Sequence, residues 1–146
     1  LEALLREIAH NGMKTMNERM MQAAIGKIGD DAIKSVGITY LNYMIEHPGI
    51  YETIQWATWH GTEETGKIFD NYLSLLKTLA LSCNFNPVNI DEILNLLTGV
   101  LHGYTTLQLR YAFTKPDESR AALSTALDTV LAGLHQKYDQ HEKGHL

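Results

Sequence analysis

The sequence contains a single cysteine, Cys83, among its 146 residues. This excludes an internal disulfide and a cysteine-cluster zinc site, and it is typical of a protein from the reducing cytoplasm. No apolar run approaches the roughly 18 residues that a membrane span requires. Basic residues are also few, since 12 lysines and arginines face 17 acidic residues, for a formal charge of −5. Because chains that bind nucleic acid are usually basic, we expect this chain to contact neither a membrane nor nucleic acid directly.

The remaining composition is that of an ordinary globular domain. Hydrophobic residues make up 45% of the chain and charged residues 20%, which is typical of a folded protein rather than a disordered one. A domain of this length buries about two-thirds of the surface of its unfolded chain, so it needs no disulfide or metal to fold. The sequence opens on Leu1 and enters a helical pattern at once. We therefore expect one domain over residues 1–146 that belongs to a longer protein.

Apolar residues recur every three or four positions along the chain, which is the spacing of one face of an α-helix. Breaks in this pattern coincide with glycines, with Pro48 and Pro116, and with the loop sequence Asn84–Pro87. The expected helices are residues 1–24, 30–46, 48–59, 62–83, 89–113 and 116–139. The apolar stripe expected for the first helix consists of Leu1, Leu4, Leu5, Ile8, Met13, Met16 and Met20.

Two helix starts carry a capping signal. Asp30 is typical of an N-cap residue for the second helix, and Asn89 followed by Glu92 resembles a capping box for the fifth. No alternating pattern of useful length indicates a strand. The sequence therefore predicts an all-α fold, a single domain of six helices.

The last two predicted helices carry two stripes each. The large stripes are Ile93, Leu97, Val100, Tyr104, Leu107 and Tyr111, and Leu123, Leu127, Val130, Leu134 and Tyr138. The second, mostly small stripes are Leu96, Gly99, Gly103, Thr106 and Arg110, and Ser119, Ala122, Ala126, Thr129 and Gly133. A helix with one buried face needs only one stripe. We expect the large stripes to face the chain's own core and the small ones a two-fold related copy, forming a four-helix dimer interface. Burial of both stripes within one compact bundle is the alternative.

Aromatic residues are concentrated between positions 40 and 72, where both tryptophans lie. Ligand pockets are mostly apolar and aromatic, with a few placed polar groups. The candidate ligand-binding residues are Tyr40, Met44, Tyr51, Trp56, Trp59, His60, Phe69, Tyr72 and His102. An ordinary filled core is the alternative, because aromatic residues and methionines at helical spacing are common there. An open volume lined by Trp56, Trp59 and Tyr72 would favour a ligand pocket.

Several short motifs, taken in order, resemble the tetracycline-repressor-like (TetR) regulators. Glu2-Ala3-Leu4-Leu5-Arg6-Glu7-Ile8 is similar to the segment that follows their DNA-binding head. The motifs that resemble the body of the subgroup with the so-called WHG domain are Tyr40–Tyr43, His47–Tyr51, Leu101–Leu107, and Pro116–Ser119 leading to Val130–Leu134. The resemblance covers nearly the whole chain. It departs from the subgroup at Val100 and Leu101, where bulkier residues are common.

The resemblance implies the C-terminal ligand-binding and dimerisation domain of a transcription regulator. A small hydrophobic effector would bind the helical body and alter operator binding by a helix-turn-helix head, which is absent from residues 1–146. Operator DNA would be contacted only through that head. The last two helices would form the homodimer, with His102 on the helix that faces both pocket and partner. The first helix, with Met13, Met16, Met20 and Met21, would be the lever between pocket and head.

Three other readings compete with this one. A metal- or haem-binding helical bundle would use Glu-x-x-His pairs, and Glu7–His10 and Glu142–His145 have that spacing, but at the extreme ends of the chain. An interaction module that dimerises without a ligand is a further alternative. An enzyme is disfavoured, because Cys83 lies on an apolar helical face and no phosphate loop or nucleophile elbow is present. We expect no catalytic residue, no metal ligand and no cofactor.

Overall fold

The computed structural model describes residues 1–110 and 115–139. Over these ranges the chain forms six α-helices and one 3-10 turn, and its one β-bridge joins Phe85 to Asp139. The elements are α1 (Glu2–Ala24), α2 (Gly29–Glu46), α3 (Pro48–His60), α4 (Glu63–Ser82), the 3-10 turn η1 (Pro87–Asn89), α5 (Ile90–Arg110) and α6 (Pro116–Tyr138). The prediction of an all-α, six-helix fold is confirmed. The expected end of the fifth helix at Phe113 lies outside the described residues.

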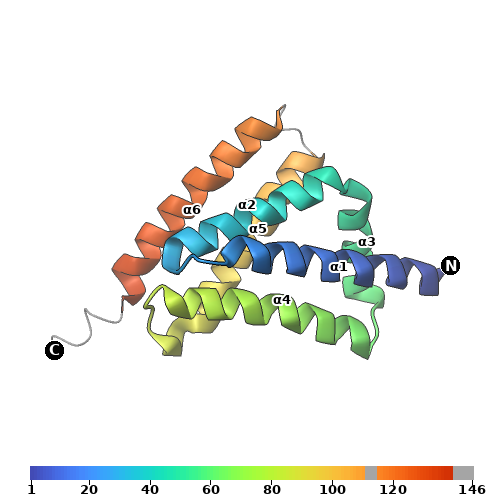
Figure 1. Ribbon diagram of the computed structural model, residues 1–146, viewed down its shortest axis with the longest axis horizontal. Coiled ribbons are helices and arrows are strands. Elements are labelled where there is room, and N and C mark those ends of the chain that lie inside the picture. The colour runs from blue at the N-terminus through green and yellow to red at the C-terminus, as the bar shows by residue number, and fades with distance from the viewer. Residues whose placement is uncertain (111–114, 140–146) are drawn as a thin grey trace.

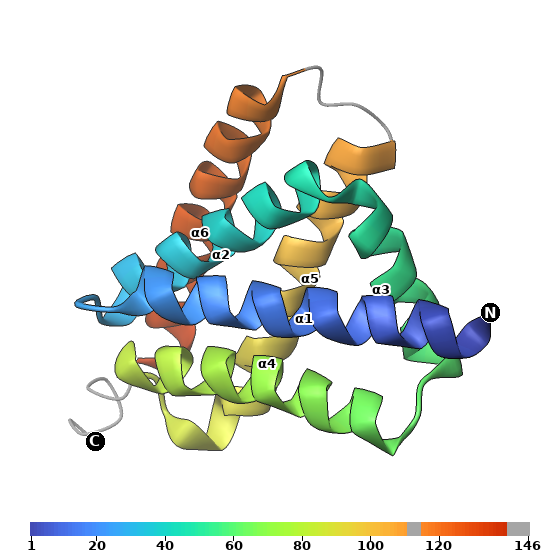
Figure 2. The ribbon, with the colours of Figure 1, turned by 45° about the vertical axis from the view of Figure 1, so that its right-hand side comes forward.

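The helices enclose one core. α1 and α4 lie alongside each other, α3 stands across their ends near the N-terminus, and α6 forms the opposite edge of the molecule (Figures 1 and 2). α2 and α5 fill the space between these edges. They contact each other, and both contact α4 and α6. This arrangement puts the first half of α1 beside α3 and α4. In the described part of the chain no helix combines the length and apolar character needed to cross a membrane.

Local sequence explains where α3, α4 and α6 begin. Pro48 and Pro116 occupy the first turns of α3 and α6, where the missing proline N–H costs no hydrogen bond. Before α4, Thr62 and Thr65 exchange the two hydrogen bonds of a capping box. The small residue Gly12 allows α1 and α3 to approach closely, because a β-carbon there would collide with Ile50.

Two predicted caps are wrong. Helix α2 begins at Gly29 after Ile28, so Asp30 lies inside the first turn, where its carboxylate accepts a hydrogen bond from His135 Nε2 at 2.8 Å. Asn89 closes the 3-10 turn before α5, and the cap there is Asn86, whose side chain accepts from Val88 N–H. The start of α2 is instead bound by a residue distant in the sequence, because the Gly29 N–H donates to Ser82 Oγ at 3.0 Å.

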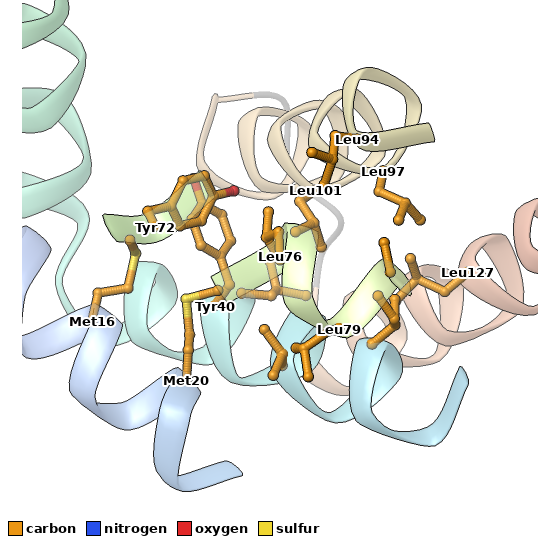
Figure 3. Close-up of a cluster of buried hydrophobic side chains, with 14 of the residues drawn as sticks. Met16, Met20, Tyr40, Tyr72, Leu76, Leu79, Leu94, Leu97, Leu101 and Leu127 are labelled. Atoms are coloured by element: carbon orange, nitrogen blue, oxygen red, sulfur yellow. The ribbon is translucent and has the colours of Figure 1, made fainter. Parts of the chain in front are cut away.

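The core has two parts of different chemistry. Figure 3 shows Tyr40 and Tyr72 beside Met16, while leucines of α4, α5 and α6 gather on the other side. The aromatic and sulfur-rich part lies between α1, α2 and α4, and its residues Met16, Met20, Tyr40 and Tyr72 are at most 3% exposed. The leucine part includes Leu97, Leu101 and Leu127 and is equally buried. Flexible methionines and polar-tipped tyrosines thus occupy one half of an otherwise aliphatic core.

The apolar stripe of the first helix differs from the prediction. Leu1, Leu4 and Ile8 are exposed, whereas Met13, Met16 and Met20 are buried. The first two turns of α1 extend beyond the core (Figure 1), where Leu1 and Leu4 are exposed and Leu5 is half-buried.

The rotational setting of α5 and α6 also differs in part from the prediction. Ile93, Leu97, Leu123, Leu127 and Leu134 face the core as expected. The predicted large-stripe residues Val100, Tyr104, Val130 and Tyr138 are only half-buried, and Leu107 is exposed. Their places in the core are taken by Leu94, Leu101, Thr105 and Leu131, and Ser119, from a predicted small stripe, is buried and donates to Gln108. The stripes therefore lie about one residue away from their expected setting, because apolar residues occupy several sides of both helices. Tyr111 lies outside the described residues.

Candidate functional site

A cavity of about 370 Å³ opens between α1, α3 and the start of α4. Its walls are Met13, Ile54, Ala57, Thr58, Trp59, Gly61, Thr62, Thr65, Gly66 and Phe69. We call this the outer cavity. None of these side chains is charged, and their polar groups are the threonine hydroxyls and the indole N–H of Trp59. The volume is at the lower end of the range of small-molecule sites in proteins.

A second, much smaller space lies deeper in the core. It is lined by Met13, Met16, Tyr40, Met44, Ile54, Phe69, Tyr72 and His102. We call this the inner chamber. Its free volume of about 10 Å³ holds no more than a single water. Met13, Ile54 and Phe69 line both spaces, so they separate the outer cavity from the inner chamber.

Tyrosine and histidine side chains from α2, α4 and α5 meet in the inner chamber. The Tyr40 hydroxyl lies 3.4 Å from His102 Nδ1, and the Tyr40 and Tyr72 ring centroids are 6.1 Å apart. The Tyr72 hydroxyl is buried and has no hydrogen-bond partner among the described residues. Burial raises the pKa of both tyrosines and lowers the pKa of His102. All three groups are therefore neutral near pH 7, and the chamber is polar without being charged.

Five of the nine predicted ligand-binding residues converge on this chamber: Tyr40, Met44, Phe69, Tyr72 and His102. The other four lie toward the surface of α3. Tyr51 is buried but donates or accepts a hydrogen bond with Thr106 at 2.6 Å, and Trp56 is half-buried and stacks on His60. His60 is exposed, and Trp59 is 87% exposed at the edge of the outer cavity. Trp56, Trp59 and Tyr72 therefore do not line one common volume.

Most walls of the outer cavity are not among the ligand-binding residues that the sequence predicts. The sequence predicts Met13 as part of a lever between pocket and head, and Ala57, Thr62, Thr65 and Gly66 carry no ligand-binding signal. The available clue was the pairing of small and hydroxyl-bearing residues around Gly61, where α3 ends and α4 begins. Such residues leave space between helices that bulkier ones would fill.

Hydrogen bonds connect α1 to α3 and α4, the two other helices around the outer cavity. His10 Nε2 of α1 lies 2.6 Å from Thr65 Oγ1 of α4, and this contact is buried. Arg6 donates to the backbone carbonyl of His60 at the end of α3. The predicted Glu7–His10 pair does not form a metal cluster with other residues of the described chain, because the His10 ring is directed to Thr65 and Glu64. Glu142 and His145 lie outside the described residues.

The nine predicted dimer-interface residues lie mainly on the outward faces of α5 and α6. Leu96, Gly99, Gly103, Thr129 and Gly133 are exposed, and Ala122 and Ala126 are half-buried. Thr106 and Arg110 point instead toward α3, where Thr106 bonds Tyr51 and Arg110 pairs with Glu52 at 3.0 Å. Shallow grooves run along this surface, and both include Val100 and Tyr104. The outward face is thus apolar, consists largely of small residues and is continuous across the two helices.

The single thiol is not part of the site. Cys83 is buried at the end of α4 and donates to the Leu79 carbonyl at 3.5 Å. Burial, first of all, and then the negative charge of the nearby Asp30 carboxylate raise the pKa of the thiol to about 12. A thiol with this pKa is protonated and unreactive at neutral pH.

Sequence comparison supplies the family. A profile of the tetracyclin repressor-like, C-terminal domain matches residues 33–130, which is more than half of the chain. The chain belongs to this family. It is also similar to the "Uncharacterized HTH-type transcriptional regulator YobS" of Bacillus subtilis (strain 168), with 26% identity over 135 residues that cover 92% of this chain and 70% of that protein.

The predicted TetR-like resemblance is thus confirmed at the level of the family, and the WHG subgroup stays a prediction. The match also favours a transcription regulator over the metal- or haem-binding bundle that the sequence left open. It covers most of α2 through most of α6, which supply the outward apolar face and all of the inner chamber except Met13 and Met16 of α1.

Proposed function

We propose that this TetR-like domain binds a small hydrophobic effector in the outer cavity and the inner chamber, and that it dimerises through α5 and α6. The observation that carries the first part is an uncharged cavity of about 370 Å³ that shares three walls with a buried Tyr–His–Met chamber. Apolar walls with a few convergent polar groups are typical of small-molecule sites.

Helix α1 is the element through which an effector would act. Met13 lines both spaces, and His10 and Arg6 bind the α4 and α3 walls of the outer cavity. A ligand that moves these walls therefore also displaces α1. It can shift the regulator only by binding one arrangement of α1 more tightly than another. The coupling is reciprocal, so operator DNA would change effector affinity by the same factor.

The dimerisation proposal is supported by the outward face of α5 and α6. Exposed Leu96 and Leu107 flank Gly99 and Gly103, beside half-buried alanines of α6. Small residues let helix axes approach closely, and two helices from each chain form a four-helix interface with two-fold symmetry. Such a face would be covered by the same face of a second copy.

Operator DNA would be bound by a helix-turn-helix segment of the intact regulator and not by this domain. The charge of −5 supports this division, because proteins that neutralise DNA phosphates usually have an excess of basic residues. The similar Bacillus subtilis protein is named as an HTH-type regulator. The regulator would act in the cytoplasm, where operator DNA lies.

The effector proposal can be tested with N-phenyl-1-naphthylamine, a neutral apolar dye whose fluorescence rises on burial. We expect one dye per chain, with energy transfer from Trp59 at the edge of the outer cavity. Gly66 lines this cavity, and a β-carbon there meets nothing within 4 Å. The substitution Gly66→Trp should therefore fill the cavity without disturbing α4 and weaken dye binding by at least about tenfold, or 1.4 kcal/mol.

Gly49→Trp is the matched control, because Gly49 is equally open but lies outside the cavity. It should leave the affinity unchanged. Equal binding by the wild type and by Gly66→Trp would show that the dye occupies another surface. The absence of dye binding to the wild type would contradict the effector proposal and favour an interaction module without a ligand.

A further inference from the structure

The Tyr72 hydroxyl differs from the hydroxyls of the tyrosines that form hydrogen bonds. Tyr51 bonds Thr106, Tyr138 donates to Glu92, and Tyr40 contacts His102. Tyr72 is only 1% exposed, lines the inner chamber and has no partner in the described part of the chain. A buried polar group without a hydrogen bond destabilises a protein, and such a group in a native structure commonly has a functional reason.

Charge is missing from every wall of the two spaces. The outer cavity is lined by apolar residues, glycines and threonines, and the inner chamber by methionines, aromatic residues and Ile54. His102, the one ionisable base there, has its pKa lowered by burial and is neutral. A charged ligand would lose its hydration here and gain no counter-ion.

The Tyr72 hydroxyl can act as a donor throughout the physiological pH range, because burial raises its pKa. The Tyr40 hydroxyl already shares a hydrogen bond with His102 Nδ1, at 3.4 Å. Among the described residues the inner chamber therefore offers the Tyr72 hydroxyl as a donor without a partner, behind the apolar residues Met13, Ile54 and Phe69 that it shares with the outer cavity.

The inner chamber can be enlarged without breaking secondary structure. Its present free volume is about 10 Å³, and Met13, Met16 and Met44 form a large part of its wall. Methionine has three rotatable bonds and adapts readily to a new neighbour. A ligand in the outer cavity can therefore reach Tyr72 when Met13, which lines both spaces, changes its rotamer.

We propose that the effector is a neutral, largely apolar molecule with a hydrogen-bond acceptor, such as a ketone or amide oxygen, which accepts from the Tyr72 hydroxyl. This inference rests on the proposed function and specifies the ligand class of the same site. It assigns a positioning and specificity role to Tyr72, with the apolar body of the ligand in the outer cavity.

The test compares two fluorescent naphthalenes of similar size. Prodan is neutral and carries a ketone, whereas 8-anilinonaphthalene-1-sulfonate is an anion. Prodan should bind at least tenfold more tightly, one molecule per chain. Tyr72→Phe should weaken prodan about fivefold, the effect of one lost neutral hydrogen bond, and shift its emission to shorter wavelength because the ketone loses its donor.

The control is Tyr43→Phe, which removes a hydroxyl from another buried tyrosine that does not line either space. It should leave prodan affinity and emission unchanged. The ligand-free Tyr72→Phe protein should also melt at the same or a higher temperature than the wild type, because the substitution removes an unpaired buried hydroxyl. A lower melting temperature would show that the hydroxyl is bonded without a ligand, and would overturn the proposal.

The remaining outcomes separate this inference from the proposed function. Equal prodan affinity and emission in the wild type and in Tyr72→Phe would overturn the role of Tyr72. Tighter binding of the anion at the same site would overturn the neutral ligand class. Binding of N-phenyl-1-naphthylamine without prodan would overturn this inference alone, whereas failure of both neutral dyes would count against the proposed function as well.

Discussion

At the end of α4, burial and a nearby negative charge both raise the pKa of the Cys83 thiol. Cys83 is 5% exposed and lies near the Asp30 carboxylate, which itself binds His135 at 2.8 Å. Burial, first of all, and then Asp30 raise the pKa of the thiol to about 12. The thiolate is therefore a negligible fraction at pH 8. Cys83 contributes to packing and not to chemistry.

We expect the folded chain to react with Ellman's reagent at pH 8 about a thousandfold more slowly than an unperturbed cysteine, whose pKa is about 8.5. The chain unfolded in guanidinium chloride should react at the ordinary rate, which provides the internal control. The measurement is the rate of release of the coloured thiolate. A folded chain that reacts as fast as the unfolded one would show that the thiol is neither buried nor suppressed by Asp30.

His102 makes the stability of the fold depend on pH. Burial lowers its pKa in the folded chain, so below about pH 6.5 the unfolded chain binds this proton more readily than the folded one does. The free energy of unfolding should therefore decrease as the pH falls from 7.5 to 5.5. His102→Gln should reduce this decrease, and urea titrations at the two pH values measure it.

His60→Gln, at an exposed position of α3, is the control for the loss of a histidine. The pH-dependent difference between wild type and His102→Gln should exceed that for His60→Gln. An identical pH dependence in wild type and His102→Gln would mean that His102 takes up its proton equally in the folded and unfolded chains.

At the scale of the elements, the outward face of α5 and α6 gives the most direct test of dimerisation. A β-carbon at Gly103 meets nothing within 4 Å in the single chain, so Gly103→Arg fits the protomer. Arginine also favours the helix over glycine by about 1 kcal/mol. The same arginine would place bulk and charge in the proposed interface. We expect it to weaken the dimer by at least about tenfold in sedimentation equilibrium.

Gly49→Arg is the matched control, because Gly49 is equally open and lies on α3, away from the proposed interface. It should dimerise as the wild type does. A Gly103→Arg protein with the dissociation constant of the wild type would show that the α5 face is not buried in the dimer.

The elements themselves could be predicted from the sequence, but their rotational setting could not. Pro48, Gly61 and Pro116 separate helices for local reasons, and the structure confirms each break. In α5, Val100 and Leu101 are apolar neighbours, but Leu101 is buried in the core whereas Val100 is only half-buried at its margin. A helix with apolar residues on several sides gives no local signal for the side that packs, because that choice depends on α2, α4 and α6.

At the scale of the whole molecule, the sequence predicted only part of the candidate site. The aromatic residues between 40 and 72 predicted an apolar site, and Tyr40, Phe69 and Tyr72 indeed line one chamber. Trp59 lies on the outer side of the short helix α3, so it reaches only the edge of the outer cavity. Met13 lines both spaces because α1 crosses α3 and α4, a relation between distant segments that spacing along the chain does not express.

For the whole molecule, we propose a dimeric domain that holds a small neutral ligand. Native mass spectrometry of the purified chain with added prodan tests both halves at once. We predict a species of two 16.4 kDa chains that carries up to two prodan molecules, and loss of the bound prodan from the Gly66→Trp protein. A single chain at micromolar concentration would contradict the dimer, and a dimer without bound prodan would contradict the ligand site as described.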